Sequence, residues 1–239
     1  MHAVTVKGIL SGANGMNLYR GCSHGCIYCD ARSACYHMDH AFEDIEVKEN
    51  ALELLEQALK RKRKPCMIAT GAMTDPYIPL ELKLGHMRGA LELVLKYGFG
   101  VALQTKSDRV LRDLDLLREI NSQTKAVVQM TLTTFDEDLC RIVEPNVCTT
   151  RARIETLCKL RDAGIPTVVW LSHIAMDQRH GRKFARNSGW MYRSTGPRNH
   201  MLWNGADPAR RQQRVLLSPV GSVLPREEGA IHSYIWQFL

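Results

Sequence analysis

Hydrophobic residues recur along most of this chain at the spacing of alternating helices and strands. Residues 50–64 predict an amphipathic helix, because leucines fall three or four positions apart on one face, and Pro65 ends it. The same reasoning extends the pattern to residue 171. It predicts further helices at 85–97, 108–120, 136–143 and 150–163, and strands at 66–69, 100–104, 126–133 and 165–171.

Strands and helices that alternate with short connections predict a parallel sheet with crossover helices. Ligands of such sheets bind at the carboxyl ends of the strands. Polar residues follow three successive strands at these ends, in 70–75, at Lys106 and Ser107, and at Thr133 and Thr134. Each alone is typical of a turn or a helix cap, as Ser107 is. Their recurrence at one edge favours a binding site.

Three cysteines lie close together, with the spacing Cys22-x-x-x-Cys26-x-x-Cys29. Three thiolates can hold three irons of a [4Fe–4S] cube, whereas closed zinc or iron–sulfur sites normally take four protein ligands. The fourth iron would stay open to a small molecule. A zinc knuckle completed by His24 or His37 is the alternative. The scattered cysteines are most simply small buried hydrophobes: Cys35, Cys66, Cys140, Cys148 and Cys158.

The cysteine motif, with Tyr28 before its third cysteine and a βα repeat after it, resembles the radical S-adenosylmethionine superfamily. The segments 17–33, 74–77 and 105–117 resemble its spore photoproduct lyase-like branch. With 132–137 and 163–172, the resemblance covers most of residues 1–172. It implies an α/β fold, a partial (β/α) barrel of the radical SAM type that lacks its last strand or strands.

The resemblance also implies how the site works. Cys22, Cys26 and Cys29 would hold a [4Fe–4S] cluster whose open iron binds S-adenosylmethionine, and an electron from the cluster would cleave it to methionine and a 5′-deoxyadenosyl radical. A flavodoxin or ferredoxin would supply the electron. No catalytic residue is assigned. The implied contacts to S-adenosylmethionine are Tyr28 beside the adenine, Thr70, Gly71, Ala72, Met73, Thr74 and Asp75 facing the methionine amino group, and Lys106 and Ser107 near the carboxylate or ribose.

The resemblance does not identify the substrate, because the sequence departs from the spore photoproduct lyase pattern at one place. Spore photoproduct lyase repairs a thymine dimer in DNA and carries a hydrogen-donating cysteine just before its Thr/Ser-Asp turn. This chain has Ala72 and Met73 there. A nucleic-acid substrate therefore stays a candidate without direct support.

Residues 173–239 form a basic tail in which the periodic pattern stops. They hold ten Lys or Arg against four Asp or Glu, most of the net charge of +7. Codons allowed for this tail, read one nucleotide later, can spell segments that resemble the missing final strand and helices. We therefore expect a frameshifted, disordered or poorly packed tail, and a sheet with an open last edge. A basic extension that binds nucleic acid is the alternative.

The leading interpretation is an enzyme, or an inactive remnant of one, that reductively cleaves S-adenosylmethionine. The alternative is a nonenzymatic, metal-stabilised nucleic-acid-binding protein. No stretch of about 18 or more apolar residues predicts a membrane span. The first residues lack a basic start followed by a long apolar run, so we expect a cytoplasmic protein in a reducing compartment.

Overall fold

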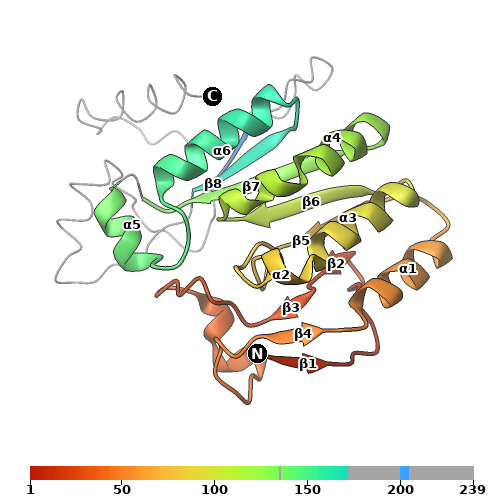
Figure 1. The fold of residues 1–239 in the computed structure, drawn as a ribbon, viewed down its shortest axis with the longest axis horizontal. Coiled ribbons are helices and arrows are strands. Elements are labelled where there is room, and N and C mark those ends of the chain that lie inside the picture. The colour runs from red at the N-terminus through yellow and green to blue at the C-terminus, as the bar shows by residue number, and fades with distance from the viewer. Residues whose placement is uncertain (135, 172–199, 205–239) are drawn as a thin grey trace.

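A computed structural model of the chain describes residues 1–134, 136–171 and 200–204. Its largest element is a sheet of six strands in the order β2-β5-β6-β7-β8-β9 (Figure 1). Neighbouring strands run parallel from β2 to β8, and β9 runs antiparallel to β8. The strands are β2 (Gly15–Met16), β5 (Met67–Thr70), β6 (Gly100–Thr105), β7 (Ala126–Leu132), β8 (Thr167–Leu171) and β9 (His200–Asn204).

Crossover helices cover one face of this sheet, with α3, α4 and α6 lying in front of the strands in Figure 1. In α3, the buried Met87, Leu91 and Val94 lie three or four residues apart, as expected for a helix that packs one face on a sheet. The predicted α/β fold with a parallel sheet is confirmed. The helices are α1 (Ala51–Arg61), α2 (Glu81–Leu84), α3 (His86–Lys96), α4 (Leu114–Gln123), α5 (Glu137–Val143) and α6 (Thr150–Asp162).

A second, three-stranded sheet lies beside the first and was not predicted. Its order is β1 (His2–Val4), β4 (Glu46–Lys48) and β3 (Tyr19–Arg20). Strands of two or three residues are too short to show an alternating pattern. The chain between β3 and β4 carries the three clustered cysteines and two short 3₁₀ turns, η1 (Asp30–Arg32) and η2 (Ala34–Tyr36).

The predicted helix at 108–120 differs in its first half. It begins as a 3₁₀ helix, η3 (Asp108–Asp113), and only then continues as α4. The carboxylate of the fully buried Asp113 accepts hydrogen bonds from Tyr77 and Arg88. The change of helix type coincides with this buried carboxylate, which the hydrophobic spacing of the segment does not reveal.

The edge of β8 is not open, contrary to the expectation from sequence. Strand β9 pairs with it along its whole length, and the apolar run 201–203 supplies a short strand in a segment that was expected to be irregular. Its antiparallel direction differs from the parallel addition of another βα unit. The rest of the basic tail, and with it the frameshift hypothesis, lies outside the described residues.

In the part of the chain that the structure describes, no helix has the length and apolar character of a membrane span.

Candidate active site at the carboxyl edge of the sheet

The cysteine loop begins at a backbone reversal that requires glycine. Gly21 has a φ of +88°, and a Cβ there would lie 2.4 Å from the carbonyl oxygen of Phe42. The same carbonyl accepts a hydrogen bond of 3.1 Å from the amide of Cys22. The thiols of Cys22 and Cys26 are buried, and that of Cys29 is half-buried.

The connection between α5 and α6 holds the loop from the other side. The amide of Ile27 donates to the carbonyl of Val143 at 3.1 Å, and the amide of Asn146 donates to the carbonyl of His24 at 3.1 Å. The side-chain amide of Asn146 also donates to the carbonyl of Ser23 at 3.0 Å. The cysteines are therefore fixed against the carboxyl edge of the sheet by residues more than a hundred positions later in the chain.

The donor atoms of this loop are not arranged for a single zinc ion. Around one tetrahedral zinc, thiolate sulfurs lie about 3.8 Å apart. The sulfurs of Cys22, Cys26 and Cys29 do not all lie within 4.8 Å of one another, and no group of three ligand atoms in the described residues includes His24 or His37 with them. A cube does not require this closeness, because each thiolate binds a different iron.

The side chain of His24 is a second feature of the loop that is consistent with a bound cofactor. Its side chain is 2 % exposed, and its Nδ1 lies 3.5 Å from Oδ2 of Asp75. Its Nε2 is buried and has no hydrogen-bond partner among the described residues. Burial lowers the pKa of His24, although Asp75 acts in the opposite direction. Buried polar atoms normally have partners, so an orphaned nitrogen between two of the cysteines is consistent with a bound group beside it.

Burial raises the pKa of two of the cysteine thiols, those of Cys22 and Cys26. The pKa of Cys22 rises to about 12, mainly through burial, and that of Cys26 rises for the same reason although Lys106 acts against it. Thiolates at Cys22 and Cys26 are therefore unfavourable in the chain alone. Bound metal ions would supply the positive charge that stabilises them.

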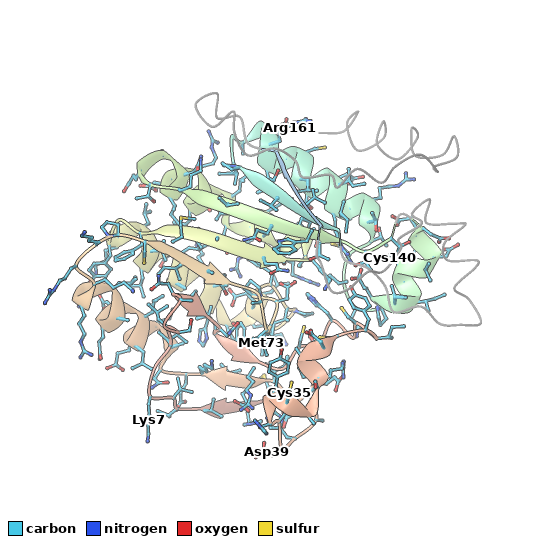
Figure 2. The ribbon with its side chains drawn as sticks, turned by 180° about the vertical axis from the view of Figure 1, so that it is seen from behind. Lys7, Cys35, Asp39, Met73, Cys140 and Arg161 are labelled. Carbon is cyan, nitrogen blue, oxygen red and sulfur yellow. The ribbon has the colours of Figure 1, made fainter. Side chains whose placement is uncertain are left out.

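The turn after β5 approaches the end of β6 so closely that only glycine fits. Gly71 has a φ of +98°, and a Cβ there would lie 1.9 Å from the carbonyl oxygen of Gln104. Thr70 and Thr74 are buried, whereas Ala72 is exposed and Met73 is half-buried. Figure 2 labels Met73 in the view from the strand side.

Asp75 accepts several hydrogen bonds at the ends of β5 and β6. Its Oδ1 accepts hydrogen bonds from the Thr105 hydroxyl at 2.7 Å and the Tyr77 amide at 2.9 Å. Its Oδ2 accepts a 2.7 Å bond from the Lys106 amide and faces His24. This carboxylate joins the ends of β5 and β6 to the cysteine loop.

We expect Asp75→Asn to lower the free energy of unfolding by about 1–3 kcal/mol, because an amide cannot accept all of these bonds. Urea titration measures the change. Asp39→Asn is the matched control, since the Asp39 side chain is 92 % exposed. Equal stability of the two variants would contradict the role given to Asp75.

Lys106 and Ser107, which were predicted together, have different surroundings in the structure. Ser107 is fully buried, and its hydroxyl accepts bonds from the amide and the guanidinium of Arg109 at the start of η3, so it is a helix cap. The ammonium of Lys106 lies 5.4 Å from the centre of the Tyr28 ring and 3.9 Å from Oε1 of Glu144. Lys106 and Tyr28 thus lie together at the rim.

A buried ion pair behind Tyr28 was missed from sequence. Oε2 of Glu144 lies 2.6 Å from Nη2 of Arg153, and both side chains are fully buried. Oε1 of Glu144 accepts hydrogen bonds from the Tyr28 hydroxyl and from the Thr133 hydroxyl. Burial alone would raise the pKa of Glu144, but Arg153 and Lys106 hold it below its usual value. Glu144 is therefore an anion that fixes the ring of Tyr28.

Arg153 carries this ion pair on the buried face of α6. Its Nη1 donates to the carbonyl of Thr131 at 3.1 Å, and its Nε donates to the carbonyl of Cys148 at 3.0 Å. In the sequence, Arg153 falls on the same helical face as Ile154, Leu157 and Leu160. An arginine on an otherwise apolar helical face is the sequence signal that could have indicated this buried ion pair.

A family model of the radical SAM superfamily matches residues 16–180. The chain belongs to the radical SAM superfamily. This membership implies S-adenosylmethionine and an iron–sulfur cluster as cofactors. The cysteine loop, the end of β5 and the rim around Lys106 all lie within the matched residues.

Curated relatives of this radical SAM chain are described as uncharacterized proteins. It is 32 % identical over 165 residues to protein Rv2578c of Mycobacterium tuberculosis, a match that covers 66 % of this chain and 48 % of the relative. It is 32 % identical over 164 residues to protein MJ0683 of Methanocaldococcus jannaschii, covering 68 % and 60 %. The chain thus spans about half the length of the curated relatives that it matches.

Solved structures of spore photoproduct lyase share the fold. One variant superposes with a TM-score of 0.55 at 14 % identity, covering 78 % of this chain and 56 % of the lyase. Another variant, with a dinucleoside spore photoproduct, has a TM-score of 0.54 at 15 % identity and covers 76 % and 54 %. This likeness supports the partial barrel fold of the radical SAM type.

Proposed function

We propose that the chain binds a [4Fe–4S] cluster through Cys22, Cys26 and Cys29 and cleaves S-adenosylmethionine reductively. The observation that carries this proposal is the cysteine loop itself, which is fixed at the carboxyl edge of the sheet beside the orphaned Nε2 of His24. When bound, the cluster supplies an electron and an open iron for S-adenosylmethionine, and the cleavage gives methionine and a 5′-deoxyadenosyl radical.

The residues around the loop have separate tasks in this proposal. Tyr28, held by Glu144 and Thr133, presents its ring to the adenine. Lys106 presents a cation to the carboxylate or ribose. The exposed Ala72 and the half-buried Met73 belong to the segment that would face the methionine amino group. The burial of Cys22 and Cys26 keeps water from these two thiols.

Lys106→Met should raise the half-saturating concentration of S-adenosylmethionine about tenfold or more, because a charge-assisted hydrogen bond is lost. Ser107→Ala should lower the free energy of unfolding by about 1 kcal/mol through loss of the cap and leave that concentration within about twofold of the original. Isothermal titration of both cluster-loaded variants with S-adenosylmethionine separates the two roles. Unchanged binding of S-adenosylmethionine by Lys106→Met would contradict the role proposed for Lys106.

The experiment that tests the proposal is anaerobic reconstitution with iron and sulfide, followed by reduction with dithionite and addition of S-adenosylmethionine. We expect 5′-deoxyadenosine and methionine in equal amounts by mass spectrometry. Product formation without added iron and sulfide, or none from protein that holds four irons, would contradict the proposal.

The substrate and the electron donor can be proposed only as classes of molecule. We propose a flavodoxin or ferredoxin as donor, a cytoplasmic location, and a nucleic acid as one candidate substrate. Described residues before the tail carry nearly balanced charge, with 22 Lys or Arg against 21 Asp or Glu in 1–172. That balance gives no electrostatic support for DNA binding.

We also propose that residues 1–172 form the truncated radical SAM core and that 173–239 are translated out of frame. The antiparallel direction of β9 supports this division, because another βα unit would add a parallel strand. Sequencing the locus tests it. An unbroken frame with synonymous codons that spoil the shifted sequence would contradict it.

A further inference from the structure

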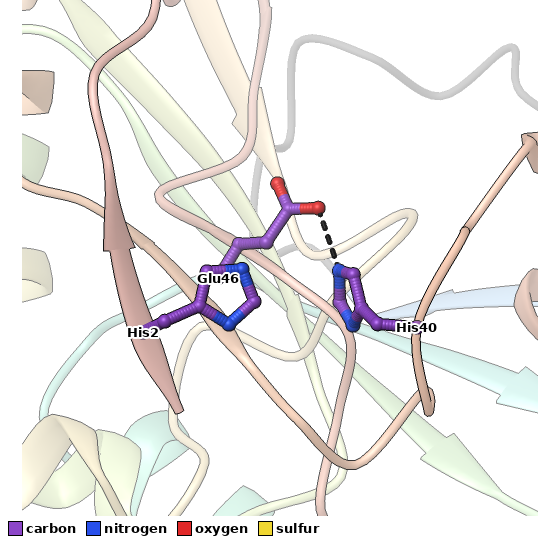
Figure 3. A group of neighbouring side chains, drawn as sticks. All are labelled: His2, His40 and Glu46. Atoms are coloured by element: carbon purple, nitrogen blue, oxygen red, sulfur yellow. Dashed lines mark hydrogen bonds and ion pairs between the residues drawn. The ribbon is translucent and has the colours of Figure 1, made fainter.

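A second group of ligand-type side chains lies in the three-stranded sheet, outside the site described above. It consists of His2, His40 and Glu46, whose ligand atoms all lie within 4.8 Å of one another (Figure 3). His2 and Glu46 are register partners in the parallel strands β1 and β4, so their side chains share one face of the sheet. His40 reaches the same place from the chain just before β4.

Both imidazoles are oriented by acceptors at Nδ1. Nδ1 of His2 lies 3.1 Å from Oδ2 of Asp44, and Nδ1 of His40 lies 3.0 Å from the carbonyl oxygen of Ala41. A nitrogen that faces an acceptor carries the proton, which leaves the lone pair of Nε2 available in His2. In His40, Nε2 also faces an acceptor, Oε1 of Glu46, so a metal ion would bind there in place of a proton. Histidines that bind metals almost always donate their other ring N–H to a carboxylate or a backbone carbonyl in this way.

The carboxylate of Glu46 can still bind a metal ion, although His40 and Arg20 both contact it. Nε2 of His40 lies 2.9 Å and Nη1 of Arg20 lies 3.3 Å from its Oε1, whereas Oε2 accepts no hydrogen bond from the described residues. Arg20 does not depend on this carboxylate, because its Nη2 donates to the carbonyls of Tyr36 at 2.7 Å and His37 at 2.9 Å. A cation can therefore take the place of the proton between His40 and Glu46 without displacing the arginine.

We propose that His2, His40 and Glu46 bind one divalent transition-metal ion of the zinc class. Two imidazole nitrogens and one carboxylate oxygen suit zinc and its first-row neighbours, whereas calcium and magnesium take oxygen ligands. The His2 side chain is 42 % exposed and those of His40 and Glu46 are 19 % and 12 % exposed, so water has access to the remaining position.

The position of this metal site gives it a structural role. The excursion that carries the three cysteines leaves the small sheet after Arg20 and returns to it at Glu46, which are register partners in β3 and β4. An ion bound to His2, His40 and Glu46 would fasten the returning end of this excursion to β1. The cluster loop would then be anchored at its base independently of the cluster.

Cobalt(II) tests the site in the full-length, cluster-loaded chain under anaerobic conditions. We expect one cobalt per chain with visible d–d bands and no sulfur-to-cobalt charge-transfer band, because none of the three ligands is a thiolate. His40→Gln and Glu46→Gln should each weaken this binding at least tenfold, and Asp44→Asn, which keeps all three ligands, about tenfold. His37→Asn is the matched control, since His37 is an exposed histidine outside the group.

Two results would overturn the proposal. The first is a cobalt spectrum that shows only bands from sulfur ligands. The second is a cobalt affinity of His40→Gln equal to that of the original chain. If His40→Gln fails to fold, the affinity of Asp44→Asn is compared instead. Circular dichroism checks the fold of each variant. Because the readout is nitrogen- and oxygen-bound cobalt, it does not depend on cleavage of S-adenosylmethionine.

Discussion

Cys26→Ala should abolish assembly of the cluster and reduce formation of 5′-deoxyadenosine to the level without protein. Two thiolates on one loop cannot hold a cube whose fourth iron is already without a protein ligand. Cys22→Ala and Cys29→Ala should have the same effect, because each sulfur would bind a different iron. Iron and sulfide analysis after anaerobic reconstitution measures assembly, and mass spectrometry measures the nucleoside.

Cys35→Ala is the matched control for these variants. Cys35 is the exposed cysteine in the 3₁₀ turn η2, six residues after Cys29 on the same excursion. We expect it to retain about four irons per chain. Retention of four irons in Cys26→Ala, or their loss in Cys35→Ala alone, would contradict the assignment of the ligands.

Arg153→Met should be the most destabilising of the substitutions outside the cysteine loop. It leaves the fully buried carboxylate of Glu144 without its ion-pair partner, which costs about 3–5 kcal/mol of the free energy of unfolding in comparable buried pairs. For a chain of this size, that loss corresponds to a fall of about 10 °C or more in the melting temperature. Scanning calorimetry or urea titration measures it.

The double variant Glu144→Leu/Arg153→Met distinguishes a buried charge from a simple packing defect. Removing both partners removes the unpaired charge, so the double variant should be more stable than Arg153→Met alone. It should still bind S-adenosylmethionine more weakly, because the Tyr28 hydroxyl loses its acceptor. Arg151→Met, a change at an exposed arginine on the same helix, should cost less than about 0.5 kcal/mol. A double variant less stable than Arg153→Met would contradict this account.

The parallel sheet could be predicted from sequence because each of its longer strands and helices has a clear hydrophobic period. The buried faces of α3 and β6 follow that period residue by residue. Short elements carry no such signal. The three-stranded sheet and α2 were missed for this reason, because their formation depends on pairing or packing with distant parts of the chain. Strand β9 is as long as β8, and it was missed because the tail around it shows no periodic pattern.

The residues of the candidate site could be predicted where a motif with fixed spacing identifies them. They could not be predicted where their role depends on tertiary contacts. The cysteine motif and the polar ends of β5 and β6 were found from sequence. The part of Asp75 in joining the ends of β5 and β6 was not, because a carboxylate in a turn has the same sequence signature whether it binds a ligand or the backbone. The capping role of Ser107 was indicated by its place before Asp108. Glu144 lies far from Tyr28 in sequence, so only the fold brings the pair together.

The most direct test of the central claim is electron paramagnetic resonance of the reduced, anaerobically reconstituted chain before and after addition of S-adenosylmethionine. If Cys22, Cys26 and Cys29 leave one iron open, the signal of the reduced [4Fe–4S] cluster should shift its g-values when the ligand binds. A spectrum that is identical with and without saturating S-adenosylmethionine would contradict an open iron at this site.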